Sequence, residues 1–122
     1  VRDVLGVFVE EFAPLRAGEV AQLSNGMKSK TWSEVSSARG AQVLASFTSG
    51  AAKDSVAVAR CGEVHPSWYV ATSLDGDSLE SLFAGIISEL GIATDGGSGV
   101  EVIKRGGRTF TIDHNSGTVS VI

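Results

Sequence analysis

A thiol, a carboxylate and an imidazole lie close together in the sequence at Cys61, Glu63 and His65, and such a set could form a cysteine nucleophile with its base. A cysteine nucleophile needs a base within hydrogen-bond reach, and it commonly stands on a strained turn between a strand and a helix. Residues 59–63 lack the glycine that this turn places before the cysteine, and a strand is expected to follow. The pattern favours a structural cysteine at the end of a strand.

Two adjacent pairs, Glu10-Glu11 and Asp113-His114, are the other candidates for acid–base chemistry. Neighbouring residues of a strand point to opposite faces, so neither pair is expected to converge on a substrate. One cysteine and two histidines provide no recognisable set of metal ligands. The glycines match neither of the common nucleotide-binding motifs. We therefore predict no catalytic residue, no metal site and no cofactor.

Three aromatic side chains, Trp32, Trp68 and Tyr69, are the candidate binding residues. Tryptophan and tyrosine are large and amphipathic, so they can stack on a sugar ring, and they are also enriched where two protein surfaces meet. Core packing or a protein interface is the favoured role for each tryptophan, and Tyr69 is assigned to an interface or to a sugar. Stacking on a sugar is the alternative.

The composition is that of a globular chain, with 122 residues, 43% hydrophobic and 20% charged. The net charge is −4 and the longest basic run is Lys104-Arg105, so nucleic acid is not an expected partner. No apolar stretch approaches the roughly 20 residues that span a bilayer, so we expect no membrane partner. A single cysteine suits a reducing compartment, and we expect a cytoplasmic protein. The absence of an initial methionine predicts a piece of a longer chain.

The elements that must position these residues are mostly strands. Gly6 is expected to end a short N-terminal helix, and residues 7–12 then predict a strand. Asn25-Gly26 is the strongest hairpin signal in the sequence, and it predicts a hairpin between residues 18–24 and 28–37.

Three further strands are predicted before the helix. Residues 41–48 alternate apolar and polar side chains, with Leu44 as the exception, and this pattern predicts a half-buried strand. Residues 55–60 form an apolar run typical of a buried central strand. Residues 68–73 are aromatic and β-branched, which favours another strand.

Residues 77–90 predict the one amphipathic helix, and we expect it to pack on a sheet. Asp77 and Glu80 suit a capping box at its start, and Gly91 suits its end. Its apolar positions recur at helical spacing: Leu79, Leu82, Phe83, Ile86, Ile87 and Leu90.

Residues 93–99 (ATDGGSG) have the composition of a linker, so we place the boundary between two domains near Gly96. Residues 100–104 and 109–113 then predict a hairpin, because Gly106-Gly107 supplies the positive φ angles of a type I′ turn. Residues 118–122 follow a second turn and complete an antiparallel meander. Alternation within its strands predicts one buried face and one solvated face.

Three segments, in order, resemble the C-terminal part of family 42 glycoside hydrolases, the bacterial β-galactosidases. They are residues 5–15 (LGVFVEEFAPL), residues 32–34 (WSE) with 40–47 (GAQVLASF), and residues 68–75 (WYVATSLD), which lead into the helix and the final meander. The resemblance covers nearly the whole chain. Residues 62–66 (GEVHP) stand in place of the family's glycine-rich turn, and residues 109–115 (TFTIDHN) in place of its aromatic-rich strand.

The resemblance implies a parent enzyme with an N-terminal (β/α)₈ barrel, an α/β domain used in trimerisation, and a small C-terminal β-domain. Residues 1–95 would be the second half of the α/β domain, and residues 96–122 the β-domain. In the family, both catalytic glutamates and a cysteine-ligated zinc site lie in the barrel. The implied partners are therefore the rest of the enzyme, further copies in a trimer, and a galactoside bound only through the barrel.

We therefore predict an α+β chain with a mainly β body, one helix packed on a sheet and a terminal meander. Its expected function is the non-catalytic, structural part of a β-galactosidase that hydrolyses terminal β-D-galactosides with retention. One alternative is a free-standing carbohydrate-binding β-module that uses Trp32, Trp68 and Tyr69. A second alternative is an amidotransferase-like enzyme with Cys61, suggested by the general shape of the family's α/β domain.

Overall fold

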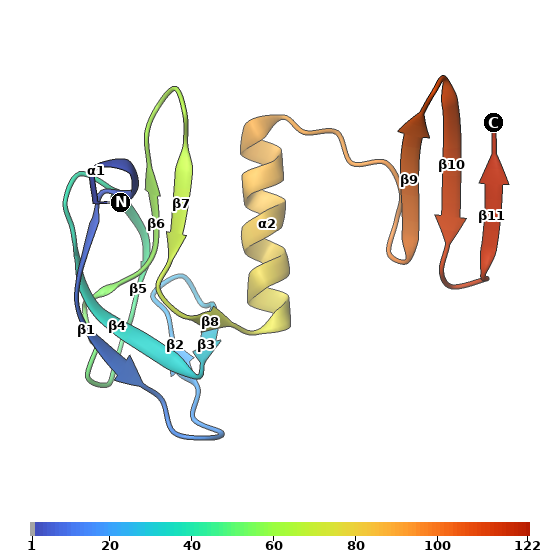
Figure 1. Ribbon diagram of the computed structural model, residues 1–122. Coiled ribbons are helices and arrows are strands. Elements are labelled where there is room, and N and C mark those ends of the chain that lie inside the picture. The colour runs from blue at the N-terminus through green and yellow to red at the C-terminus, as the bar shows by residue number, and fades with distance from the viewer. Residues whose placement is uncertain (1) are drawn as a thin grey trace. The chain divides into compact units, whose positions relative to one another are not determined.

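The computed structural model describes residues 2–122, and these residues form short antiparallel strands and one long helix (Figure 1). This architecture confirms the predicted fold class. The elements in chain order are α1 (Arg2–Leu5), β1 (Val7–Pro14), β2 (Ala21–Gln22), β3 (Lys28–Lys30), β4 (Trp32–Ala38), β5 (Gln42–Ser46), β6 (Val56–Cys61), β7 (Ser67–Val70), β8 (Ser73–Leu74), α2 (Gly76–Leu90), β9 (Val100–Arg105), β10 (Arg108–Asp113) and β11 (Thr118–Val121).

The chain divides into two compact units, one reaching to Phe83 and the other comprising residues 84–122. Helix α2 spans this division. The predicted domain boundary between residues 95 and 96 stays a prediction, because a division into compact units does not define where a domain begins. None of the helices in residues 2–122 is long and apolar enough to cross a membrane.

The first unit contains three small antiparallel sheets, with strand orders β1-β4, β2-β3-β8 and β5-β6-β7. Strand β6 is the centre of its sheet, and the four side chains of residues 56–59 are at most 2% exposed. This confirms the predicted buried central strand. Val56 and Ala59 of β6 pack with Val7 of β1, and Ala41 and Tyr69 cover the same cluster.

Gly6 ends helix α1 and allows strand β1 to join this core. Its φ angle is +61°, and a side-chain carbon at this position would lie 2.7 Å from the Ala41 nitrogen and 2.9 Å from the Cys61 sulfur. The Gly6 carbonyl accepts hydrogen bonds from the amides of Arg39 and Ala41. The position therefore needs glycine both for its backbone conformation and for its space.

The prediction of one strand over residues 28–37 is wrong, because Thr31 divides that segment. Thr31 has a φ angle of +74°, and its carbonyl accepts a hydrogen bond from the Leu15 amide at 2.9 Å. The chain turns at this residue, so β3 pairs with β2 and β8, whereas β4 pairs with β1. The hairpin around Asn25-Gly26 is present between β2 and β3.

Two irregular strands break the alternation that the sequence predicts. In β5 the register shifts on both sides of Ala45, so Ala45 and Phe47 are 1% exposed whereas Val43 is 41% exposed. In β1 the register shifts between Val9 and Glu11. A bulge of this kind turns the following side chains to the other face of the strand.

Helix α2 begins one residue earlier than predicted and has a different cap. The amide of Ser78 donates to the Asp75 carboxylate at 2.9 Å, and the Ser78 hydroxyl accepts a hydrogen bond from the Lys28 amide. Hydrogen bonding from the Ser78 side chain, and then from its amide, lowers the pKa of Asp75. The predicted capping box at Asp77 and Glu80 is therefore wrong. Asp75 caps the helix instead, because the contact of Ser78 with strand β3 places the first turn of the helix earlier. The end at Gly91 is confirmed by a Schellman motif, in which Ile92 and Gly91 donate to the carbonyls of residues 87 and 88.

Fewer apolar residues of α2 are buried than the sequence predicts. The buried residues of the helix are Ser78 and Leu82, which lie one turn apart. Leu79 and Phe83 lie on the same stripe but are 43% and 54% exposed.

The second unit contains the predicted meander, with strand order β11-β10-β9. Gly106 and Gly107 have φ angles of +55° and +74°, which is the conformation of the predicted type I′ turn. At the second turn, the Asp113 carboxylate accepts hydrogen bonds from the amides of Asn115 and Ser116. All of residues 84–122 are described and each is at least partly exposed, so the second unit does not bury a face by itself, and the predicted buried face stays a prediction. Three short strands have too little apolar area to bury a face by themselves.

Candidate functional site

Cys61 ends strand β6, where its sulfur lies against the backbone of Gly6. Its carbonyl accepts a hydrogen bond from the Ser67 hydroxyl, which also bonds to the Val4 carbonyl. His65 lies in the exposed turn that follows, and within residues 2–122 no hydrogen bond joins it to Cys61. The thiol is therefore placed for packing, and the structure does not bring a base to it.

Neither of the two acidic pairs is assembled for acid–base chemistry. The Asp113 carboxylate is used by its own turn, whereas His114 Nε2 lies 3.4 Å from the Glu101 carboxylate on the neighbouring strand. Glu10 and Glu11 are both exposed at the bulge of β1. In the described part of the chain, no three histidine, cysteine or acidic side chains are grouped so that they could hold a metal ion.

Tyr69 forms a partly buried polar contact in the first unit. Its ring packs against the cluster of Val7, Val56 and Ala59, and its hydroxyl donates a hydrogen bond to the carboxylate of Glu34 on β4. Glu34 is only 8% exposed. Burial raises the pKa of Tyr69, and the hydrogen bond and charge of Glu34 raise it further. The contact ties β7 to β4 and so joins two sheets.

Sequence reasoning missed Glu34 as a partner of Tyr69. Glu34 and Ser36 are two residues apart in a strand, and such residues share a face. This spacing could have indicated that both side chains point toward the core. Ser36 is also buried, and its hydroxyl donates to the Val56 carbonyl at 3.1 Å. A carboxylate on the same buried face needs a hydrogen-bond donor, because burying an unpaired charge is costly.

The two tryptophans lie away from this contact. Trp68 pairs with Arg60 across β6 and β7, and the guanidinium carbon lies 5.7 Å from the centre of a Trp68 ring. Because Trp68 and Tyr69 are consecutive on one strand, they point to opposite faces. Trp32 begins β4, pairs with Pro14, and accepts a hydrogen bond from the Thr72 hydroxyl through its carbonyl. The structure therefore does not gather the three predicted binding residues on one surface.

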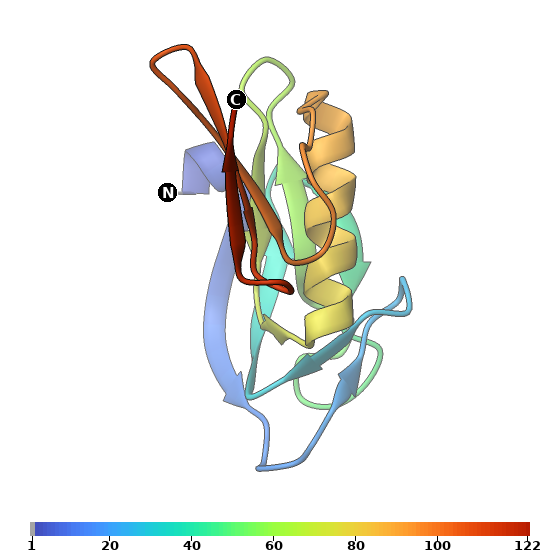
Figure 2. The same ribbon diagram turned by 90° about the vertical axis from the view of Figure 1, so that its right-hand side faces the viewer.

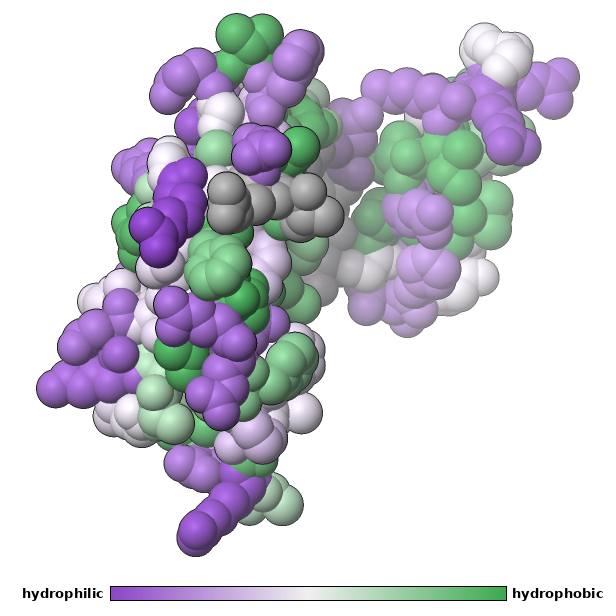
Figure 3. All heavy atoms as spheres, turned by 60° about the vertical axis from the view of Figure 1, so that its left-hand side comes forward, coloured by the Kyte–Doolittle hydropathy of each residue, from purple (hydrophilic) through white to green (hydrophobic). Residues whose placement is uncertain are grey.

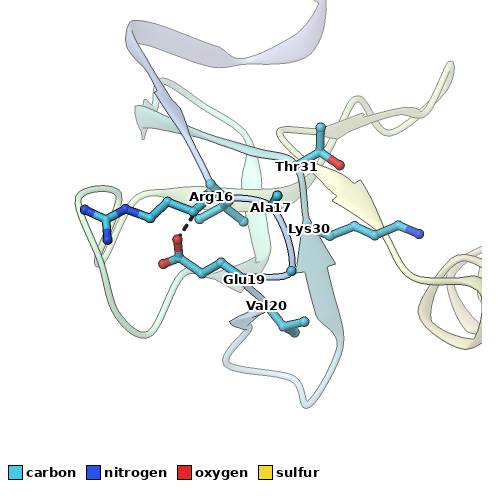
Figure 4. A pocket seen from close by; sticks show the side chains of 8 residues that line it. Arg16, Ala17, Glu19, Val20, Lys30 and Thr31 are labelled. Atoms are coloured by element: carbon cyan, nitrogen blue, oxygen red, sulfur yellow. Dashed lines mark hydrogen bonds between the residues drawn. The ribbon is translucent and has the colours of Figure 1, made fainter.

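A hollow of about 410 Å³ lies beside the loop between β1 and β2, which extends away from the sheets in Figure 2. Figure 4 shows its lining, where Arg16 and Lys30 extend in opposite directions. The Glu19 carboxylate accepts a hydrogen bond from the Arg16 amide at 3.0 Å and so closes the loop on itself. Its charged groups do not converge, and the hollow has no arrangement for acid–base chemistry.

Strand β1 carries the apolar surface that stands out in the first unit. It pairs with β4 on one side, and no other strand of the described chain pairs with it. Phe8 and Val9 are each 38% exposed, and Phe12 is 65% exposed. Hydrophobic side chains reach the surface among polar ones on the face turned forward in Figure 3. We call residues 8–12 the β1 edge.

The bulge in β1 determines how the β1 edge is arranged. Val9 pairs with Ser36 and Phe12 pairs with Glu34, and Ser36 and Glu34 share a face of β4. Cross-strand partners lie on the same face, so Val9 and Phe12 also share a face although they are three residues apart. Without the bulge they would point in opposite directions.

An exposed apolar edge strand in a mainly β body, with no catalytic group assembled in residues 2–122, is typical of a domain that mediates association. The family model described as the beta-galactosidase trimerisation domain matches residues 1–93. The chain belongs to this family.

Curated relatives agree with this assignment. A β-galactosidase of Arthrobacter sp. is 35% identical over 128 residues, which is 98% of this chain and 18% of the relative. A β-galactosidase of Heyndrickxia coagulans is 37% identical over 111 residues, or 85% of this chain and 16% of the relative. The chain thus spans less than a fifth of the curated relatives that it matches.

Solved structures share the fold. The β-galactosidase of Bacillus circulans sp. alkalophilus has a TM-score of 0.79 and 28% identity over 93% of this chain and 19% of that one. The β-galactosidase of the Antarctic haloarchaeon Halorubrum lacusprofundi has a TM-score of 0.73 and 20% identity, over 92% of this chain and 18% of that one.

Proposed function

We propose that this chain is the non-catalytic, assembly-forming part of a larger β-galactosidase, called the parent enzyme below. The parent enzyme would hydrolyse terminal β-D-galactosides with retention, through two glutamates in a separate (β/α)₈ barrel. Membership of the trimerisation family supports this proposal, as does the small share of each relative that the chain covers. A barrel of that type needs about 250 residues by itself.

The observation that carries the proposal is the β1 edge. An edge strand with exposed apolar side chains is a liability in a free protein, because it invites pairing and aggregation. Phe12 is 65% exposed although it belongs to a strand of a folded body. A neighbouring protomer that covered Phe8, Val9 and Phe12 would remove this apolar surface from water and stabilise the assembly.

The partners of the chain would be the rest of the parent enzyme and two further copies in a homotrimer. The galactoside would be bound only through the barrel, and this chain would need no cofactor. We place the parent enzyme in the cytoplasm, in keeping with its one cysteine in this region. Cys61 would have a structural role there.

Of the three aromatic residues predicted for binding, we propose that Trp68 contributes to a protein interface and that Trp32 and Tyr69 hold the strands together. Tyr69 has its hydroxyl engaged by Glu34, whereas Trp68 lies on the opposite face of β7 beneath Arg60. Titrating galactose or lactose against tryptophan fluorescence separates this role from sugar stacking. A saturable change in the isolated chain would favour the carbohydrate-binding role and contradict the interface role.

The decisive experiment measures the mass of the parent enzyme by light scattering after Phe12→Ser. We expect the assembly to dissociate, because the variant replaces an apolar contact worth about 2 kcal/mol per interface with a polar side chain. Val64→Ser is the matched control, since Val64 is 83% exposed and lies outside the β1 edge. An intact assembly in the Phe12 variant would overturn the proposed role of the edge, and galactosidase activity of the 122-residue chain alone would overturn its non-catalytic role.

A further inference from the structure

Positive charge is distributed very unevenly along this chain. Residues 61–103 contain seven acidic residues and neither lysine nor arginine. The three basic residues of the second unit, Lys104, Arg105 and Arg108, then fall within five positions. They flank the Gly106-Gly107 turn at the tip of the hairpin between β9 and β10, and we call residues 104–108 the basic tip.

The two arginines of the basic tip stand directly opposite each other. Arg105 pairs with Arg108 across β9 and β10, so the two side chains share a face of the hairpin. Lys104 points to the other face and forms a salt bridge of 2.8 Å with Asp95. Within the second unit, which is described in full, neither guanidinium has an ion-pair partner. Like charges directly opposite each other destabilise a hairpin, so an anion between them would remove this cost.

The tip also has space for such an anion. A hollow of about 340 Å³ is lined by residues 104–109. Gly106 and Gly107 have no atoms within 4 Å of the position that a side-chain carbon would occupy. A carboxylate can therefore approach the guanidinium groups without a steric obstacle at the turn. Arginine suits this contact, because its planar group bonds a carboxylate through two parallel N–H groups.

The group that binds the basic tip can be inferred from charge and from the symmetry of the assembly. This inference rests on the proposed function. A trimer cannot use one self-complementary patch, so two different surfaces of the protomer must meet in each interface. The β1 edge is one such surface, and it carries Glu10 and Glu11 exposed at its bulge without a salt bridge in residues 2–122. Its partner surface should be basic.

We infer that the basic tip of one protomer binds the carboxylates of Glu10 and Glu11 on the β1 edge of a neighbouring copy. The apolar residues of the edge would contribute most of the buried area. The arginines would select the register and the neighbour, because charge complementarity contributes to specificity and to association rate more than to affinity.

The test measures protomer dissociation of the parent enzyme by sedimentation, at about 50 mM and about 500 mM salt. Arg105→Glu with Arg108→Glu should weaken assembly at low salt by at least about tenfold. Adding Glu10→Lys and Glu11→Lys should restore assembly to within about threefold of the original, because the charges are then exchanged. Arg105→Gln with Arg108→Gln should weaken it less and should reduce its dependence on salt.

The matched control is Arg39→Glu with Lys53→Glu, which changes the net charge equally at exposed loop positions and should leave assembly unchanged. Circular dichroism and amide exchange in β10 check that each variant keeps its strands. The inference is overturned if the arginine variants assemble like the original, or if the charge exchange does not restore them. If they assemble normally while Phe12→Ser dissociates, only this inference fails. If Phe12→Ser also assembles normally, the proposed function fails with it.

Discussion

The two units of this chain are stabilised in different ways. In the first unit, residues 56–59 of β6 are almost completely buried, and the cluster of Val7, Val56 and Ala59 joins strands that are far apart in the sequence. In the second unit every residue of the meander is at least partly exposed, and two turns of favourable residues hold the strands in register. Burial accounts for the first unit, whereas local turn chemistry accounts for the second.

The second unit has less burial of its own than the first. A three-stranded sheet without a buried face is close to the lower limit of independent stability. Phe110 pairs with Ile103 and Val121, and Ile112 pairs with Val119. Because Phe110 and Ile112 are two residues apart on β10, all five side chains share one face of the meander. Hydrophobic side chains gather on the meander in Figure 3. These apolar side chains are at least partly exposed within the second unit.

Replacing one phenylalanine in each unit should produce the largest difference in the free energy of unfolding. Phe47 is 1% exposed, so Phe47→Ala should lower the free energy of unfolding of the first unit by about 3–5 kcal/mol. Phe110 is partly exposed, so Phe110→Ala should cost less than about 2 kcal/mol. Urea unfolding followed by tryptophan fluorescence reports the first unit, which contains both tryptophans, and amide exchange in β10 reports the meander. Equal losses would contradict the contrast between the units.

Two glycines test whether space or conformation matters more. Gly6→Ala should destabilise the first unit by about 2–4 kcal/mol, because the new carbon would meet the backbone of Ala41 as well as adopt a positive φ angle. Gly107→Ala meets open space, so it should cost about 1 kcal/mol from conformation alone. Thermal unfolding measured for both variants makes the comparison. A larger loss at Gly107 would show that the meander turn is more constrained than the core.

Two side-chain contacts provide the smallest expected contrast. Tyr69→Phe should cost about 1–2 kcal/mol near neutral pH, because the buried Glu34 carboxylate loses its donor. His114→Ala removes an exposed contact with Glu101 and should cost less than about 0.5 kcal/mol. Chemical unfolding at neutral pH measures both, and similar losses would mean that the two contacts are equivalent.

The same tyrosine predicts a dependence of stability on alkaline pH. Burial and Glu34 raise the pKa of Tyr69 above its ordinary value of 10.0. The folded state therefore keeps the proton longer than the unfolded state does. The resulting stability is fully present below pH 10 and declines as the pH rises through the higher pKa of the folded state. The Tyr69→Phe variant should lack this part of the decline, which unfolding curves at neutral and alkaline pH would show.

Much of the fold could be predicted because its signals are local. The type I′ turn at Gly106-Gly107, the helix end at Gly91 and the apolar strand over residues 56–59 each depend on a few consecutive residues, and all three are present. The helix cap was placed wrongly because two aspartates, Asp75 and Asp77, compete within three positions. Local preference alone does not distinguish them.

The candidate site was less predictable than the fold. Trp68 and Tyr69 looked equivalent in the sequence, yet Trp68 lies beneath Arg60 whereas Tyr69 donates a hydrogen bond to the buried Glu34. The face of β1 on which Phe12 lies depends on the bulge at Glu10. No residue type in residues 7–14 predicts that bulge. Which aromatic residue is available for a partner therefore depends on pairing with a strand more than 20 positions away.

By itself, the sequence determined the turns, the central strand, the end of the helix, and a resemblance to one enzyme family whose model matches residues 1–93. Backbone conformational preferences act over two to four residues, so these features can be seen in the chain alone. Only the tertiary structure decided that Thr31 divides a strand, that Ser78 joins β3 and selects Asp75 as the cap, and that β1 has an open edge. Register, bulges and burial depend on distant residues that meet only when the chain has folded.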